Sequence, residues 1–327
     1  MAEIADWESH IGRRLRLRDL HVFAKVVQLG SMAKAAAQMR VTQPAVSHVI
    51  ADLEHALGVS LLDRSPQGVT PTIYGETLMK GGAAAFDDLR QTIRQIEFLA
   101  NPTAGEVRIG CPETVAALIA PIVEQLSRRY PGVVLHVADV AAPTLDLPQL
   151  RDRSLDLAMV RIAGSPSGHR YGDDLDVEVL LNDETRIVVG KDSPWARRRR
   201  IDLAELAGEH WILPPGNSLN STVVVEAFRA RDLPIPKICL VTYSMQLRAR
   251  VVAAGRHISV SPRSVLRLNA DEMSLKELPI DLPSMEWPIA LVQLKNRMVN
   301  PVVQLFIKEV RATFKPLDEA PKSAKRG

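Results

Sequence analysis

The side chains best suited to chemistry lie at the start of a predicted helix, where Thr42, Gln43 and Pro44 are followed one turn later by Ser47 and His48. Hydroxyl and amide groups can donate hydrogen bonds to the edges of DNA bases and accept them in return. Thr42 is a suitable N-cap, and Pro44 is tolerated because first-turn amides have no helical partner. The start of this helix therefore has the composition of a DNA-reading surface.

A shorter helix, predicted over residues 32–39, must position the first one. Ser31 can cap it, and Gly58 can end the helix that follows. We expect a small-residue packing face made of Ala33, Ala36 and Ala37 on the shorter helix, and a buried stripe of Ala45, Val49, Ile50 and Leu53 on the longer one. The pattern predicts a helix-turn-helix, although plain helical bundles also contain such pairs.

Two short strands are predicted after the second helix, at residues 61–64 and 69–70, with a turn at 65–68 between them. A hairpin in this place makes a winged helix-turn-helix. Arg64 lies at the base of the wing, where a guanidinium can reach a phosphate or enter the minor groove. The basic run before the domain is better explained as a solvated face; it consists of Arg13, Arg14, Arg16 and Arg18.

Residues 20–75 resemble the N-terminal domain of the LysR-type transcriptional regulators, through the stretches LHVFAKVVQLGSMAKAAAQMRVTQPAVS, DLEHALGVSLLDR and GVTPTIYGE. The resemblance implies that Gln43, Pro44 and Ser47 contact bases or the DNA backbone. It also implies that Ser31 caps the first helix of the motif and that Arg64 is the wing contact.

The chain departs from the family at a few positions. His48, Ala51 and Asp52 stand where the family usually has basic or amide residues, and Pro71 replaces a usual aliphatic residue. Fewer phosphate contacts imply weaker, more salt-sensitive DNA binding, or greater reliance on the avidity of a dimer.

The composition of the chain agrees with a regulator. Its 327 residues are enough for two or three domains, and a net charge of +3 means that DNA binding must come from a local basic patch. Cys111 and Cys239 lie too far apart in sequence for a metal motif, and the histidines are scattered, so no metal or other cofactor is expected. Without a signal peptide or a long apolar run, the chain is expected in the cytoplasm.

A long helix is predicted over residues 72–100, because the segment lacks proline. Its apolar stripe is close to a heptad and consists of Leu78, Ala85, Leu89, Ile96 and Leu99. We expect a coiled-coil dimerisation arm of about 40 Å; the alternative is a single helix folded back on the winged domain. Gly81 and Gly82 indicate either a close helix approach or a bend. Residues 101–105 are expected to form a hinge.

From Glu106 onward, apolar strands alternate with helices, which predicts an α/β fold with mostly parallel sheets. The region resembles the family's two-lobed, periplasmic-binding-protein-like effector domain, through GEVRIG, LDLAMV, WARRRRIDLAELAGEHWILPPG and VVAAGRHISVSP. The resemblance implies lobe I over residues 106–161 and 263–316 and lobe II over 162–262, with the chain crossing near Ile162 and Pro262. Residues 317–327 are expected to be a flexible tail.

Candidate effector-binding residues lie at strand ends and helix starts, where α/β folds bind ligands. Glu113 and Thr114 follow the first strand, Arg161 ends the third, and Tyr243 and Ser244 start a helix of lobe II. Family members commonly contact the effector with a hydroxyl residue near Thr114. Glu113 would repel an anionic ligand, which Arg161 could offset. The competing interpretation is helix caps or an inter-lobe ion pair; the run Arg197 to Arg200 is interpreted as solvated surface.

The sequence therefore predicts a ligand-responsive, sequence-specific DNA-binding transcriptional regulator and no enzymatic activity. The expected partners are a double-stranded DNA operator, a small-molecule effector of unknown identity and further copies of the chain in a homodimer or homotetramer, with RNA polymerase as a further candidate. Two alternatives stay open: an architectural DNA binder whose C-terminal lobes only oligomerise, and an enzyme with a DNA-binding head. The sequence shows none of the common nucleotide-binding, hydrolase or metal motifs.

Overall fold

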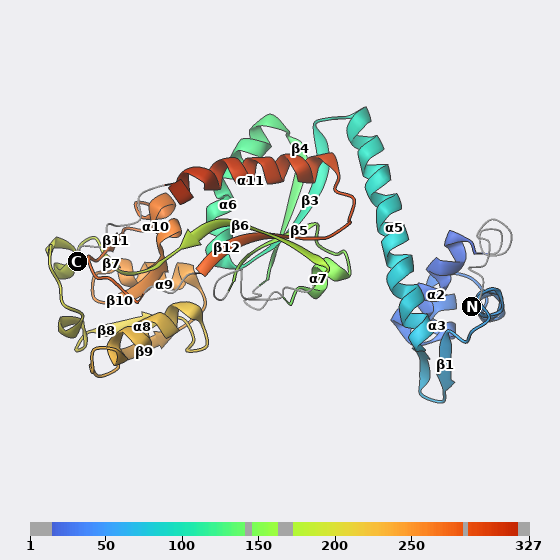
Figure 1. The fold of residues 1–327 in the computed structure, drawn as a ribbon, viewed down its shortest axis with the longest axis horizontal. Coiled ribbons are helices and arrows are strands. Elements are labelled where there is room, and N and C mark those ends of the chain that lie inside the picture. Colours follow the sequence, from blue (N-terminus) through green and yellow to red (C-terminus); the bar gives the residue numbers. More distant parts are fainter. Residues whose placement is uncertain (1–14, 141–145, 163–172, 284–286, 320–327) are drawn as a thin grey trace. The chain divides into compact units, whose positions relative to one another are not determined.

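The computed structural model describes residues 15–140, 146–162, 173–283 and 287–319 and is shown in Figure 1. The chain divides into two compact units, Met1–Thr92 and Ile93–Gly327. Arg13 and Arg14 of the predicted basic run lie outside the described residues, as does most of the predicted tail.

The first unit is a winged helix-turn-helix. It contains α2 (Leu17–Leu29), α3 (Met32–Met39), α4 (Gln43–Leu57) and an antiparallel hairpin of β1 (Leu62–Ser65) and β2 (Gly68–Pro71). Phe23, Val26, Ala35 and Ile50 are fully or almost fully buried in its core. The predicted helices and the wing are confirmed.

The predicted packing faces of α3 and α4 were partly wrong. Ala45 is exposed and Val49 is half buried, whereas Val46 is buried together with Ile50 and Leu53. On α3, Ala33 and Ala37 are exposed, and the helix packs through Met32, Ala35 and Ala36. On each helix the stripe was assigned partly to neighbours of the residues that face inward, because several adjacent positions carry small or apolar side chains.

The long helix α5 (Ile73–Ala100) begins against the wing. The Thr72 hydroxyl donates to the Ser60 carbonyl at 2.7 Å and accepts from the Gly75 amide at 3.2 Å. A Cβ added to Gly75 would lie 2.2 Å from the Leu61 carbonyl oxygen, so this close approach requires glycine. One helix continues through Gly81 and Gly82, and an added Cβ there would meet nothing within 4 Å, so no close approach within the described part of the chain explains this pair.

Lobe I of the second unit is a five-stranded sheet in the order β4-β3-β5-β12-β6. Its strands are β3 (Ala104–Cys111), β4 (Gly132–Asp139), β5 (Leu157–Arg161), β6 (Leu175–Asp183) and β12 (Trp287–Leu294). Successive side chains of a strand point to opposite faces of the sheet. Leu157 and Ile289 pack against α6 (Glu113–Arg129) and α11 (Pro301–Glu319), while Ala158 and Ala290 pack on the side of α7 (Pro148–Arg151).

Lobe II is a second five-stranded sheet, in the order β11-β7-β10-β8-β9. The strands are β7 (Thr185–Gly190), β8 (His210–Leu213), β9 (Lys237–Val241), β10 (Ile258–Pro262) and β11 (Leu275–Glu277). One face packs with α8 (Leu219–Arg229) and the 3-10 turn η4 (Leu203–Leu206), and the other with α9 (Met245–Ala253). Helix α10 (Arg263–Asn269) contributes to a core cluster of each lobe, and η3 (Pro194–Arg197) lies after β7.

The sheets are mixed rather than mostly parallel. In lobe I, β3 pairs parallel with β4 and β5, but β12 pairs antiparallel with β5 and β6. In lobe II, β8 pairs parallel with β9 and β10, whereas β7 pairs antiparallel with β10 and β11.

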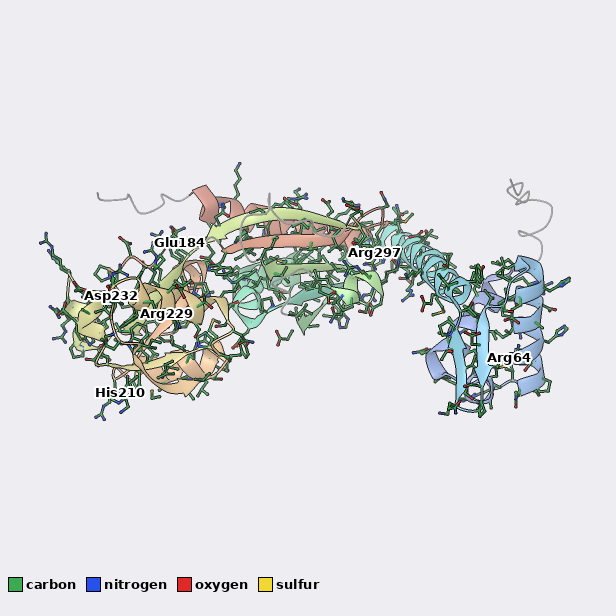
Figure 2. The ribbon with its side chains drawn as sticks, turned by 60° about the horizontal axis from the view of Figure 1, so that its bottom comes forward. Arg64, Glu184, His210, Arg229, Asp232 and Arg297 are labelled. Carbon is green, nitrogen blue, oxygen red and sulfur yellow. The ribbon has the colours of Figure 1, made fainter. Side chains whose placement is uncertain are left out.

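The predicted lobe boundaries near Ile162 and Pro262 were wrong. Strand β6 pairs along β12 in lobe I, so the chain crosses to lobe II at Glu184 (Figure 2) and returns between β11 and β12. The sequence did not reveal β6 and β11, because both strands mix charged and apolar residues. Such mixing is usual at a sheet edge, where β6 is half exposed and where β11 also lies. The predicted hinge was also too long, since Ala104 and Gly105 pair with Gly132 and Val133 in the sheet.

Candidate DNA-reading surface and effector site

The first turn of α4 presents its polar side chains to solvent. Thr42 caps the helix by accepting from the Ala45 amide at 3.4 Å, and Gln43 and Pro44 are exposed. Ser31 caps α3 in the same way, accepting from the Lys34 amide at 3.3 Å. His48 is exposed but faces the Asp52 carboxylate at 3.4 Å, one turn later. The exposed Gln43 amide is thus available to a base edge.

Ser47 differs from its neighbours, because its side chain is directed partly inward. It is half buried, and its hydroxyl donates to the Met32 sulfur of α3 at 3.4 Å. This contact joins the two helices of the motif. In this geometry Ser47 is a helix-packing residue as well as a candidate DNA contact.

Arg64 lies exposed on the wing, in β1 (Figure 2). Its guanidinium is 3.7 Å from a carboxylate oxygen of Glu54 in α4. The other Glu54 oxygen accepts from the Leu61 and Leu62 amides at 2.8 and 3.3 Å. Glu54 therefore fixes the start of the wing to α4 and holds Arg64 beside it. Sequence patterns did not identify this role, because a single glutamate near a helix end has no recognisable spacing.

In the second unit, Glu113 bridges the two lobes. It is the first residue of α6, and its carboxylate accepts from the Met245 amide at 2.8 Å and from the Gln246 amide at 3.3 Å at the start of α9. Ser244 caps the next amide of α9, that of Leu247, at 3.3 Å. The N-terminal amides of α9, which would otherwise attract an anion, are therefore occupied from within the chain.

Arg161, at the end of β5, takes part in a second inter-lobe network. It forms an ion pair of 2.8 Å with Asp183, and both side chains are largely buried. Its guanidinium also lies 3.4 Å from the Thr114 hydroxyl and 3.5 Å from that of Ser264. Asp183 accepts in addition from the Ser264 amide at 3.0 Å and from the Ser264 hydroxyl. A buried charge is tolerated where it is paired and hydrogen-bonded in this manner.

Arg248 lies behind the start of α9 and is almost completely buried. It donates to the Thr242 and Tyr243 carbonyls at 2.8 and 2.9 Å, while its Nε has no partner among the described residues. Burial lowers the pKa of this guanidinium, and the negative charge of Glu113 acts in the opposite direction. The side chain borders a cavity of about 10 Å³, the size of one water molecule, together with Met245, Ser259 and Ser261.

The remaining predicted residues have other surroundings. Tyr243 is exposed, and its hydroxyl donates to the Asn217 side chain at 2.9 Å. Burial raises the pKa of the Cys111 thiol to about 12, with the Asp139 charge as a second cause, so this thiol is protonated at neutral pH. In the Arg197 to Arg200 run, Arg198 pairs with Glu205 at 2.5 Å and covers the Trp195 ring, consistent with a solvated surface.

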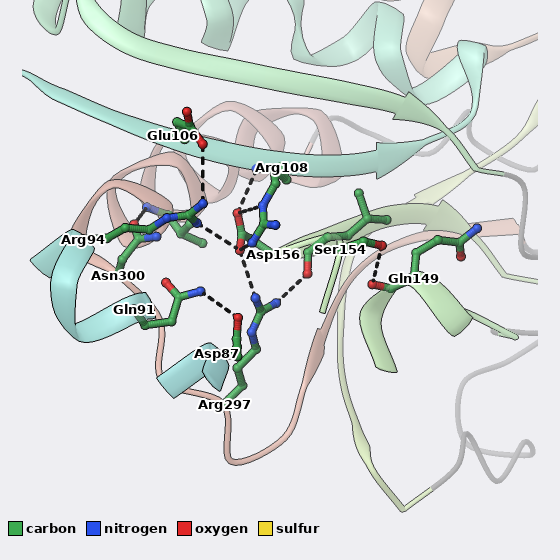
Figure 3. A network of polar contacts seen from close by, with 12 residues as sticks. Asp87, Gln91, Arg94, Glu106, Arg108, Gln149, Ser154, Asp156, Arg297 and Asn300 are labelled. Carbon is green, nitrogen blue, oxygen red and sulfur yellow. Dashed lines mark hydrogen bonds and ion pairs between the residues drawn. The ribbon is translucent and has the colours of Figure 1, made fainter. Parts of the chain in front are cut away.

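The opposite end of β5 is connected to the long helix. Asp156, just before β5, is buried and receives the Arg108 and Arg297 guanidiniums at 3.0 and 3.1 Å (Figure 3). Arg94, in the last turns of α5, lies 3.9 Å from Asp156 and 3.4 Å from Glu106. The strand that carries Arg161 at the lobe junction therefore ends beside the anchor of α5. Sequence analysis missed this cluster, because its members are far apart along the chain.

The predicted dimerisation stripe on α5 is mostly exposed. Ala85, Leu89, Ile96 and Leu99 face solvent, and Ile93, which was not predicted, joins them. Leu78 was assigned wrongly, because it packs against the core of the winged unit.

Within the described residues, the structure contains no cluster of side chains suited to a metal ion, and none of its helices is long and apolar enough to cross a membrane. These findings concern only that part of the chain.

Two family models match the chain. Residues 17–76 match the bacterial regulatory helix-turn-helix protein of the lysR family, and residues 100–315 match the LysR substrate binding domain. Among curated relatives, the HTH-type transcriptional regulator GbpR of Azospirillum brasilense is 26% identical, covering 94% of this chain and 89% of that protein. The nitrogen assimilation regulatory protein nac of Escherichia coli is 27% identical, covering 90% and 94%.

Solved structures share the fold. A full-length OxyR variant from Pseudomonas aeruginosa aligns with a TM-score of 0.59 at 20% identity, covering 92% of this chain and 97% of that one. Full-length CbnR in complex with its target DNA aligns with a TM-score of 0.55 at 19% identity, covering 91% and 100%. At this level of identity the likeness concerns the fold alone.

Proposed function

This chain belongs to the LysR family of bacterial transcriptional regulators, and we propose that α4 reads its operator through Gln43, Pro44 and Ser47 while Arg64 of the wing contacts the DNA backbone. The observation that carries the assignment is the capped and solvent-facing first turn of α4. Amide and hydroxyl groups in that position can make paired hydrogen bonds to base edges in the major groove.

The second part of the proposal is control by a small molecule bound where the lobes meet. Glu113, Thr114, Arg161 and Ser244 converge there from both lobes, which supports an effector site at this junction. A ligand that changes the contacts between lobes can act on Arg161, and β5 carries the displacement to Asp156 and the Arg94 anchor of α5. The effector would then shift the population of sensor conformations and the spacing of paired winged units.

The proposed assembly is a homodimer or homotetramer paired through α5. Exposed apolar side chains along one long helix are the expected signature of a missing helix partner. Leu89→Lys combined with Ile96→Lys should give monomers in sedimentation-velocity experiments, while Gln95→Lys on the same helix should not. A double variant with the wild-type sedimentation coefficient would rule out pairing through this stripe. We further expect action in the cytoplasm and, for activation, contact with RNA polymerase.

The function is tested by selecting bound fragments from the source genome with the full-length protein. We expect a shared motif of two half-sites, and footprinting should show protection that changes when the effector is added. Recovery of fragments without a common motif would favour the alternative of an architectural DNA binder. Identical protection with and without a proven effector would contradict the coupling between sensor and DNA.

A further inference from the structure

The start of α9 in lobe II has the features of an anion site but is already satisfied from within. It offers the Met245 and Gln246 amides, and both are bound by the carboxylate of Glu113. Helix N-termini attract anions through these free amides and the positive end of the helix dipole. An acidic effector that bound at this helix start would compete with Glu113 for the same amides.

The buried Arg248 is an independent indication that this place was built to hold a negative charge. Its side chain is only 3% exposed, its Nε has no partner among the described residues, and it borders the small cavity beside Met245. A buried guanidinium is costly unless a negative charge compensates it. Glu113 is an anionic group whose charge acts on Arg248.

The arginines that the structure places at the junction already have counter-charges from the described part of the chain. Arg161 is paired with Asp183, and the negative charge of Glu113 acts on Arg248 from beyond ion-pair distance. Around the crossover, Glu184 receives both Arg186 and Arg263. Asp139, which is opposite Cys111 in the sheet register, adds another carboxylate near the start of α6.

We infer that Glu113 is an internal ligand, which supplies from lobe I the carboxylate that the start of α9 binds, and that the effector of this regulator is therefore a compound without an anionic group. The inference rests on the proposed effector control and assigns Glu113 as the residue that determines this specificity. A neutral polar effector can hydrogen-bond to the carboxylate of Glu113, whereas an acidic one would meet its charge.

Acetate is the probe that tests this assignment, because it is the carboxylate of Glu113 without the protein chain. Full-length wild type and Glu113→Ala are titrated with sodium acetate against sodium chloride at equal ionic strength, and the thermal unfolding temperature is recorded. Acetate should raise the unfolding temperature of Glu113→Ala saturably, by about 2–4 °C over chloride. The wild type should respond to both salts alike.

Glu124→Ala is the matched control, because Glu124 is an exposed carboxylate on the same helix, paired with Arg128 one turn later and not with the start of α9. It should behave as wild type. Glu113→Gln provides a second test if the alanine variant does not fold, since it removes the charge and keeps the volume. Its response to acetate should be smaller than that expected for Glu113→Ala.

Equal acetate responses in wild type and the Glu113 variants would overturn the inference, as would the absence of a response in both variants. Binding of the wild type to its selected operator is measured in the same buffer. If the wild type did not bind its operator specifically, the proposed function would be contradicted, but the acetate result would still stand. Failure of the proposed function and failure of the inference about Glu113 are therefore distinguishable.

Discussion

The two units of this regulator hold their functional polar groups in opposite ways. In the winged unit, the Gln43 amide faces solvent at the start of a capped helix. In the second unit, Glu113 binds the start of α9 in the other lobe, and the pair of Arg161 and Asp183 binds Ser264. The proposed DNA contacts are therefore exposed in the free protein, whereas an effector bound at the lobe junction would have to exchange with contacts that the chain already makes.

The largest loss of stability is expected when the internal pairing at the lobe junction is removed. Asp183→Ala removes the partner of the largely buried Arg161 and the acceptor of Ser264, and it should destabilise the sensor unit by about 3–5 kcal/mol in urea unfolding. Arg311→Ala, which breaks an exposed pair with Glu178, should cost about 1 kcal/mol or less. Equal losses of unfolding free energy in the two variants would show that the buried pair at the junction contributes no more to stability than the exposed pair.

A smaller change in stability is expected where α5 meets the winged unit. Gly75→Ala places a Cβ against the Leu61 carbonyl and should destabilise the winged unit by roughly 1–3 kcal/mol. Gly81→Ala has open space in the same helix and should instead stabilise it by about 0.5–1 kcal/mol. Thermal unfolding of both variants provides the measurement, and stabilisation by Gly75→Ala would refute the close approach.

Much of the winged unit could be predicted from its sequence, because its contacts are local. The cap at Thr42, the hairpin turn and the length of α5 all depend on residues close in the chain. The errors were of another kind. Val46 rather than Ala45 faces inward because tertiary packing decides among adjacent apolar residues.

The sensor unit was less predictable, because its decisive contacts join distant residues. The amides that donate to Glu113 lie more than one hundred residues away in sequence. Asp156 lies within ion-pair distance of arginines from three separate segments. Strand β6 was missed because a half-exposed edge strand lacks a continuous apolar run. The structure brings Glu113, Thr114, Arg161 and Ser244 to the lobe junction but leaves Tyr243 exposed beside Asn217, and none of their partners could be identified from spacing.

The smallest expected effect distinguishes backbone contact from base reading within the winged unit. Arg64→Ala should weaken binding to operator and random DNA alike and reduce the slope of log affinity against log salt by about 1. Fluorescence anisotropy over a salt series measures this slope. An unchanged slope would mean that Arg64 remains with Glu54 and does not meet a phosphate.

Reading of DNA sequence by the exposed start of α4 is the core of the proposed function. It is tested most directly by comparing operator and random-DNA affinities of wild type, Gln43→Ala and the control Gln38→Ala, an exposed amide on α3. Gln43→Ala should lose about 1–3 kcal/mol of discrimination through weaker operator binding alone, and Gln38→Ala should lose none. Equal loss of affinity for operator and random DNA in Gln43→Ala would contradict base reading by this side chain.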